Sequence, residues 1–319
     1  MNKLQRQNEY CKRINAAMNF ITEHADRDLS LDEIAKVAMF SKYHFHRIFK
    51  AIAGETVAEF IRRVKLQKSA NILLFNPNID ITTIALDCGF SSSQNFAKAF
   101  KKYYNQSPSE FRKNPRDNPH SRNSDSQNSK HGNIKSNQVN ASSPPQTYHA
   151  KHLTEPSFDV SRSLRMNIQI EDMPTYPVAY IRTYGLSNET CSNAFQELMQ
   201  WAKPRNLQDG ERIGLCWDNP EVTPSEKCRF DACIALPGDY AGDCKLSQQK
   251  INGGKYAVGK FEINKPEKFG DCWDTMFLWL SESGYQPADK PPYQIMHSSP
   301  EELAELIFRF EICIPIQPL

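Results

Sequence analysis

The chain has no run of about 18 or more apolar residues, so the sequence predicts no membrane-spanning helix. Its start, MNKLQRQNEYCKR, lacks the apolar core of a secretory signal. The nine cysteines stand singly without a CxxC pair, and no set of metal ligands surrounds the closest two, Cys228 and Cys233. We therefore expect a cytoplasmic protein with reduced, mostly buried thiols, no metal site and no cofactor.

An excess of charge is also missing, since 39 Lys and Arg against 37 Asp and Glu leave a net charge of +2. That balance hides an uneven distribution. Residues 1–115 carry 18 basic and 11 acidic side chains (net +7), residues 116–165 carry 7 and 4 (net +3), and residues 166–319 carry 14 and 22 (net −8). A basic region suits a polyanionic partner and an acidic one does not, so we expect nucleic-acid binding in the front part only.

Residues 116–163 have almost no aromatic side chains and no hydrophobic periodicity, and are rich in Asn, Ser, Pro, His and Lys. Such a segment cannot bury enough apolar surface to become ordered, so it predicts a disordered, flexible linker. About 48 flexible residues have a root-mean-square span of roughly 35–40 Å. A slack tether transmits little strain, so a signal between the flanking regions must pass by docking, by dimerisation or by a third partner.

One phrase occurs twice between residues 30 and 112: FHRIFKAIAGETVAEF is followed 51 positions later by FAKAFKKYYNQSPSEF, so that Phe45 corresponds to Phe96. In both copies the apolar residues have helical spacing. A shorter helical stretch precedes each copy, at 31–38 and 81–88, and a tight turn joins the pair. Two helices connected by a three- or four-residue turn form a helix-turn-helix, so the sequence predicts an all-α region with two such units.

The connections between these stretches can also be predicted. Ser41 and Ser92 are expected to be the N-caps of the longer helices, and Gly89 supplies the permissive backbone of the second turn. Residues 56–75 form one long helix between the units. Twenty helical residues span roughly 30 Å, close to the ~34 Å between successive major grooves on one side of B-DNA. One chain could thus place both units on the same side of a duplex.

The side chains opposite the apolar stripes have the chemistry of major-groove reading, in which Arg pairs with guanine, Gln with adenine, a small apolar group with the thymine methyl, and Lys with phosphate. They could instead be ordinary solvated helix faces, an alternative that the matching register of two copies disfavours. The expected DNA-contacting residues are Tyr43, His46, Arg47 and Lys50 in the first copy and Ser93, Gln94, Ala97, Lys98 and Lys101 in the second.

With the run GFSSSQNFAKAFKKYYNQSPSEFR, residues 12–114 resemble the AraC-type DNA-binding domain of bacterial transcription regulators. The resemblance covers the whole duplicated region. It implies double-stranded promoter DNA as the partner. By matching positions, it implies base or groove contacts from six of the residues above: Tyr43, His46, Arg47, Gln94, Ala97 and Lys98.

From Met166 onward strands and helices alternate. Strand-like segments at 166–171 and 176–185 are followed by a helix at 191–203 and two strands near 210–217 and 230–236. Another strand at 254–263, a helix at 266–283 and two closing strands follow. Strand, helix and strand pair thus occur twice, which predicts a pseudo-duplicated α+β domain. A cleft between two half-domains is the usual place for a small-molecule pocket.

The segments GLCWDNPEVTPSEKCRFDACIALP, GGKYAVGKFE and PPYQIMH are similar to the gyrase-inhibitor-like effector-binding domain. This resemblance runs over about 150 residues and implies a small-molecule effector, for which we expect contacts from Trp217, Trp273 and Gln294. Relatives that bind cationic drugs or are proposed to hydrolyse small molecules carry a glutamate where Gln294 stands. A neutral amide cannot offset a buried cation or act as a general base, so we expect binding without catalysis.

The sequence therefore predicts a multidomain chain, with a DNA-binding domain at 1–115, a linker at 116–163 and an effector-binding domain at 164–319. The expected function is that of a DNA-binding transcription regulator and not of an enzyme. Two alternatives give the back half another role. It could be a small-molecule hydrolase, or a protein-interaction module for RNA polymerase or gyrase.

Overall fold

The computed structural model describes residues 3–76, 78–120, 167–238, 240 and 245–319. The predicted disorder of residues 121–163 lies outside these residues. The first part of the predicted linker is, however, packed: Asn118 is buried, and its side-chain amide donates to the carbonyl oxygen of Glu221 (3.2 Å). The ordered N-terminal region thus extends to His120. None of the helices within the described ranges is both long and apolar enough to cross a bilayer.

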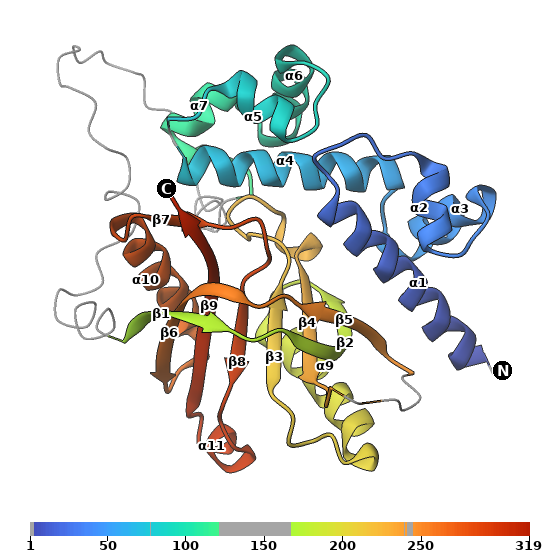
Figure 1. Ribbon diagram of the computed structural model, residues 1–319, viewed down its shortest axis with the longest axis vertical. Helices are drawn as coiled ribbons and strands as arrows, with labels where there is room; N and C mark the ends of the chain where they lie inside the picture. The colour runs from blue at the N-terminus through green and yellow to red at the C-terminus, as the bar shows by residue number, and fades with distance from the viewer. Residues whose placement is uncertain (1–2, 77, 121–166, 239, 241–244) are drawn as a thin grey trace, which may run out of the picture.

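The N-terminal domain is entirely helical, and two helical units lie near opposite ends of one long helix, α4 (Figure 1). Each unit has its own apolar core. One core contains Phe45, Phe49 and Phe60, and the other contains Phe96, Phe100 and Phe111. The helices are α1 (Lys3–Glu23), α2 (Leu31–Val37), α3 (Lys42–Ala53), α4 (Val57–Phe75), α5 (Ile81–Asp87), α6 (Ser93–Tyr104) and α7 (Pro108–Lys113), followed by the 3-10 turn η1 (Pro115–Asp117).

The two units differ in their turns and caps. Gly89 has a φ of +71°, as expected, and a Cβ atom there would lie 2.7 Å from the carbonyl oxygen of Asp26. The first unit places Met39 at this point with a φ of 52°, a backbone conformation that costs an L-residue about 1–2 kcal/mol. Ser92 caps α6 by accepting from the backbone N–H of Asn95 (3.2 Å). Ser41 precedes α3 but makes no such capping bond, because its hydroxyl pairs with His44.

The C-terminal domain is a curved sheet with one helix-covered face. The sheet order is β1-β6-β9-β8-β3-β4-β2-β5, and β7 pairs with the end of β9. The strands are β1 (Ile168–Met173), β2 (Tyr176–Tyr184), β3 (Arg212–Cys216), β4 (Arg229–Ala235), β5 (Ser247–Ile251), β6 (Gly254–Ile263), β7 (Tyr285–Pro287), β8 (Tyr293–Met296) and β9 (Phe308–Pro318). The helices are α9 (Asn188–Ala202), α10 (Phe269–Glu282) and α11 (Pro300–Ala304), and the 3-10 turns are η2 (Lys203–Arg205), η3 (Ser225–Lys227) and η4 (Pro266–Lys268).

This order confirms the predicted duplication. In chain order, β1-β2-α9-β3-β4 corresponds to β5-β6-α10-β8-β9, and corresponding strands lie at mirrored positions in the sheet, so a pseudo-two-fold axis passes between β8 and β3. Helix α9 packs on β2 and β4, and α10 packs on β6 and β9. The opposite face builds a separate apolar core whose buried residues come from the strands, among them Tyr180, Ile213 and Tyr293, and Trp217 packs against it. The axis therefore lies in the groove between the two helices.

Candidate functional sites

The residues predicted to read DNA lie on α3 and α6 with the expected orientation. Phe45 and Phe49 on α3 are completely buried, as are Phe96 and Phe100 on α6, so both helices turn an apolar stripe inward. The remaining surface of each helix is polar. The exposed predicted residues are His46, Arg47 and Lys50 on α3 and Gln94, Lys98 and Lys101 on α6.

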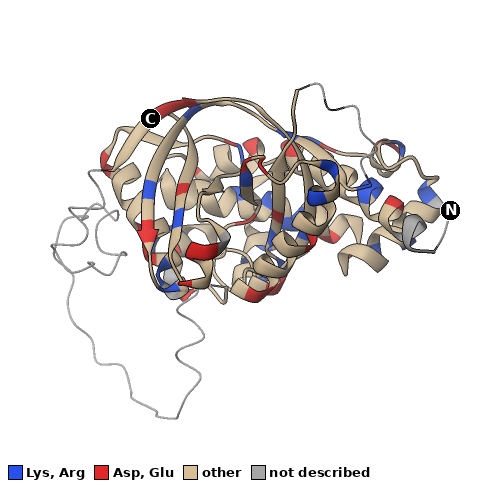
Figure 2. Cartoon of the chain, turned by 90° about the horizontal axis from the view of Figure 1, so that it is seen from below, with Lys and Arg blue, Asp and Glu red and all other residues tan. Residues whose placement is uncertain are grey.

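Three predicted residues differ from this pattern. Ser93 and Ala97 are half-buried, and Tyr43 lies in α3 with a side chain outside the described part of the structure. Basic residues recur along the helices near the N-terminus (Figure 2). Both helices can thus present a polar face to a partner without unfolding either core.

The C-terminal domain is docked against the helical domain on a different surface, which includes α1 and α4 (Figure 1). The end of α6 and the residue that follows η1 also contact it. On α1, the amide of Asn19 donates to Oε1 of Gln249 (2.8 Å). On α4, Asn71 accepts from the amide of Asn219 (2.9 Å). No exposed predicted DNA-contacting residue takes part in these described contacts, so the docked chain leaves those side chains accessible.

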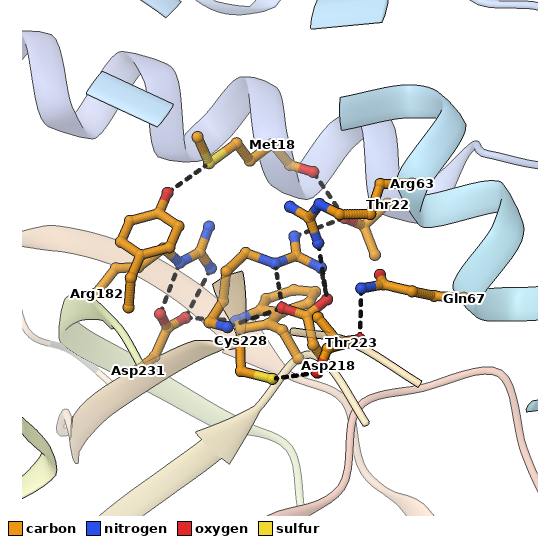
Figure 3. A network of polar contacts seen from close by, with 12 residues as sticks. Met18, Thr22, Arg63, Gln67, Arg182, Asp218, Thr223, Cys228 and Asp231 are labelled. Carbon is orange, nitrogen blue, oxygen red and sulfur yellow. Dashed lines mark hydrogen bonds and ion pairs between the residues drawn. The ribbon is translucent and has the colours of Figure 1, made fainter. Parts of the chain in front are cut away.

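A network of buried charges lies at the centre of this interface (Figure 3). Arg229 of β4 makes a bidentate pair with Asp218, with both N–O distances 2.8 Å. A second guanidinium, that of Arg63 on α4, lies 3.7 Å from Asp218 and donates to Oε1 of Glu55 (2.7 Å). Nη1 of Arg229 also donates to the hydroxyl of Thr22 on α1 (2.9 Å). The network therefore joins three helical-domain residues to two of the C-terminal domain.

The charges in this network stabilise one another. Burial alone would raise the pKa of Asp218, but the adjacent guanidinium groups of Arg229 and Arg63 outweigh it and hold that pKa below its ordinary value. Burial would lower the pKa of Arg63, and Asp218 and Glu55 reverse that effect and raise it. Gln67 completes the set. With its amide turned by 180°, Nε2 donates to Asp218 (3.1 Å) and Oε1 accepts from Arg63 (3.0 Å).

The loop between β3 and β4, residues 217–228, carries the docking contact to the second helical unit. Val222 is completely buried and belongs to the same apolar core as Phe96 and Phe100. The hydroxyl of Tyr104, at the end of α6, donates to the carbonyl oxygen of Val222 (3.0 Å). The first unit is contacted by Tyr184 of β2, whose hydroxyl donates to the sulfur of Met18 (3.3 Å). The C-terminal domain thus contacts both units.

A cavity of about 2040 Å³ runs between α9, α10 and the helical domain. It exceeds the ~300–1,000 Å³ typical of a single-ligand pocket, so one ligand would fill only a part of it. Its floor lies at the pseudo-two-fold axis, where Gly214 of β3 pairs with Gln294 of β8. A Cβ at Gly214 would lie 2.8 Å from the ring of Phe230, so glycine keeps this point open beside the Gln294 amide. Within the described residues that amide makes no hydrogen bond.

The three predicted effector residues line this cavity but do not lie together. Trp273 on α10 and Gln294 on β8 both face the helix-covered side of the sheet. Because side chains alternate along a strand, Trp217 follows Ile213 and Leu215 onto the opposite face. Its indole N–H donates to Oδ2 of Asp231 (2.7 Å). The structure thus places Trp273 and Gln294 on the helix-covered side of the sheet, and Trp217 in a separate cluster on the opposite face.

That separate cluster centres on Asp231, which is one of the acidic residues, with Glu262 and Glu226, that the hydrolase alternative offers as candidates. Arg182 donates to both carboxylate oxygens of Asp231 (2.7 and 2.8 Å), and the amide of Gln249 adds a third donor (2.9 Å). Burial would lower the pKa of Arg182, but the Asp231 carboxylate raises it above its ordinary value. With every oxygen bonded, Asp231 is not placed to act as a free base. Through Gln249 the cluster also reaches Asn19 of α1.

Comparisons with known proteins match the helical domain and the C-terminal domain to two separate families. The family described as a GyrI-like small molecule binding domain matches residues 166–317, and that described as a helix-turn-helix domain matches residues 13–114. A DNA gyrase inhibitor of Citrobacter rodentium is 28% identical over 158 residues, covering 48% of this chain and 99% of the inhibitor. The right origin-binding protein of Escherichia coli K12 is 41% identical over 92 residues, covering 29% of this chain and 32% of that protein.

Among solved structures, the crystal structure of the EcmrR C-terminal domain is similar over 48% of this chain and 98% of that chain. Its sequence identity is 10% and its TM-score 0.39. The chain thus spans nearly the whole length of the gyrase inhibitor, but only about a third of the length of the origin-binding protein.

Proposed function

Because the chain joins a helix-turn-helix domain of the AraC type to a GyrI-like small molecule binding domain, we propose that it regulates transcription by reading two neighbouring major grooves while its C-terminal domain senses an effector. The observation that supports this most directly is the matched placement of α3 and α6. Both bury the same two phenylalanine positions, and both expose polar side chains on the other side. The docked C-terminal domain covers neither set of exposed predicted residues.

Within each helix we assign different roles to different residues. Arg47 can form a bidentate pair with guanine, and Gln94 can do so with adenine, so these two residues would carry sequence preference. Lys50 and Lys101, closer to the end of each helix, would contact phosphates. This division supports a regulator that prefers particular sites over a general DNA-binding protein.

Exchanging Arg47 for alanine tests the assignment. We expect Arg47→Ala to cost about 1–3 kcal/mol at the preferred duplex and to relax one base position. The matched variant Lys50→Ala, on the same helix, should weaken preferred and random duplexes alike and reduce the salt dependence of binding. Titration of both duplexes at two salt concentrations measures this. Equal losses for Arg47→Ala on preferred and random DNA would refute its base-reading role.

For the C-terminal domain we propose ligand binding without catalysis. The floor of the cavity offers the amide of Gln294, which can donate and accept a hydrogen bond but cannot abstract a proton at neutral pH. The nearby aromatic wall, including Trp273, suits an apolar or planar molecule. Turnover of a small molecule by the full chain, abolished by a substitution in this wall, would contradict the proposal.

A further inference from the structure

The far side of the effector cavity is formed by the DNA-binding domain itself. Lys68, Asn71, Ile72 and Phe75, all on α4, line the same cavity as Trp273 and Gln294. From these shared walls we propose that the effector site is composite. A largely apolar aromatic ligand would contact α4 as well as the C-terminal domain. The proposal rests on the effector role proposed above and adds where the ligand is held.

A series of stacked rings connects the two walls. Phe75, in the last turn of α4, stacks on Phe277 of α10 with ring centroids 5.3 Å apart and planes 24° apart. Phe277 in turn stacks on Trp273 at 6.2 Å and 26°. A ligand that packs against Trp273 therefore meets a surface whose position depends on Phe75. Aromatic pairs of this kind contribute about 0.5–1.5 kcal/mol beyond their buried area.

An ion pair holds α4 beside this stack. Nζ of Lys68 lies 2.5 Å from Oδ2 of Asp289, and both residues line the cavity. Burial would lower the pKa of Lys68, but its hydrogen bond with Asp289 raises it, so Lys68 remains protonated at neutral pH. Since these two charges compensate each other and the floor residue is a neutral amide, the site described by these groups does not require a charged ligand. The stacked rings of its walls favour an aromatic molecule.

The composite arrangement links ligand binding to docking. A ligand that touches both domains binds the docked chain more tightly than a chain whose domains have separated, and it stabilises the docked form by the same factor. Because α4 connects the two helix-turn-helix units, the ligand would act directly on the element that separates them. Signalling between the domains would then not depend on the predicted linker, which is too slack to transmit strain.

The experiment uses the full chain and the uncharged fluorescent probe N-phenyl-1-naphthylamine. Its affinity is measured by fluorescence titration for the natural sequence and for Phe75→Ala, Phe75→Leu and Trp273→Ala. Ile61→Ala is the matched control, because Ile61 is a partly buried apolar residue of α4 that does not line the cavity. Circular dichroism and thermal unfolding establish that each variant folds. Phe75→Leu keeps apolar bulk without the ring, in case Phe75→Ala does not fold.

We expect Phe75→Ala and Trp273→Ala each to weaken probe binding by roughly three- to tenfold, with a smaller loss for Phe75→Leu and none for Ile61→Ala. If both Phe75 variants bind the probe as the natural sequence does while Trp273→Ala weakens it, the site belongs to the C-terminal domain alone. The composite proposal is then wrong, and the proposed effector cavity stands. If Trp273→Ala also has no effect, or the natural chain does not bind the probe, the proposed cavity fails as well.

Discussion

The helical domain has two functional surfaces of opposite character. The predicted DNA-reading surface on α3 and α6 is exposed, polar and repeated. The docking surface on α1 and α4 is buried and unique, with Arg63 only 3% exposed and Asp218 packed against it. Binding DNA needs side chains that remain free for a partner. Docking needs desolvated groups that are already paired, so a change on each surface should have a different consequence.

The largest expected effect is a loss of stability that distinguishes two neighbouring arginines of α4, the buried Arg63 and the exposed Arg62. Removing one member of a buried charge network leaves the others uncompensated, so we expect Arg63→Met to lower the free energy of unfolding of the full chain by about 3–5 kcal/mol. The matched control is Arg62→Met. Because Arg62 is exposed, this substitution should change the free energy of unfolding by no more than about 0.5 kcal/mol. Urea denaturation measures both. Similar losses for the two variants would show that the network does not stabilise the chain.

A smaller loss is expected where the C-terminal domain enters the core of the second unit. Val222→Ala removes two buried carbon groups, each contributing about 0.8 kcal/mol, and leaves a small cavity, so the loss should be about 2 kcal/mol. Leu86→Ala, on α5 of the same unit, is the control, since Leu86 is 55% exposed. Urea denaturation measures the free energy of unfolding of both variants. A Val222→Ala chain as stable as the natural one would mean that the loop 217–228 does not dock there.

At the first unit, a single hydrogen bond of the docking contact can be removed on its own. Tyr184→Phe removes only the hydrogen bond from the tyrosine hydroxyl to the Met18 sulfur, a weak acceptor, so we expect a loss of about 0.5–1 kcal/mol. The same denaturation experiment compares it with Val222→Ala. A loss larger than that of Val222→Ala would show that the Tyr184 hydroxyl does more than donate to a weak sulfur acceptor.

The smallest expected effect is a dependence of stability on pH. The pKa of Asp218 is lowered in the folded chain, so its contribution to stability is complete above the ordinary aspartate value of about 3.9 and is lost as the pH falls through the lowered value. The stability difference between the natural chain and Asp218→Asn should therefore be constant from about pH 7 to 5 and shrink below about pH 4. A difference that stays constant down to about pH 2 would contradict the assigned pairing.

The two surfaces also differ in how far the sequence predicts them. The reading surface could be derived because Phe45 and Phe96 recur at fixed spacing, and a repeated apolar stripe defines its opposite face. The duplication of the C-terminal domain followed in the same way from its alternating strands and helices. Short elements without a strong pattern were missed, among them β5 (Ser247–Ile251), β7 (Tyr285–Pro287) and α11 (Pro300–Ala304).

The docking surface could not be predicted, because its partners lie far apart in the chain. Nothing in the spacing of Arg63 and Asp218 indicates that they meet. Val222 reads as an ordinary loop residue, although it fills the core of another domain. Trp217 shows a smaller limit of prediction from sequence. The sequence predicts that Trp217 and Trp273 contact the same effector, but strand alternation places the two on opposite faces of the sheet.

The most direct test of the docked arrangement is the energetic coupling between Arg63 and Asp218, which lie in different domains. Urea denaturation of the natural chain, Arg63→Met, Asp218→Asn and the double variant gives this coupling, because the cycle subtracts the effects that each residue has within its own domain. We expect the two substitutions to be non-additive by about 1 kcal/mol or more. Additive losses, with a coupling indistinguishable from zero, would show that the two domains are not held together through this network.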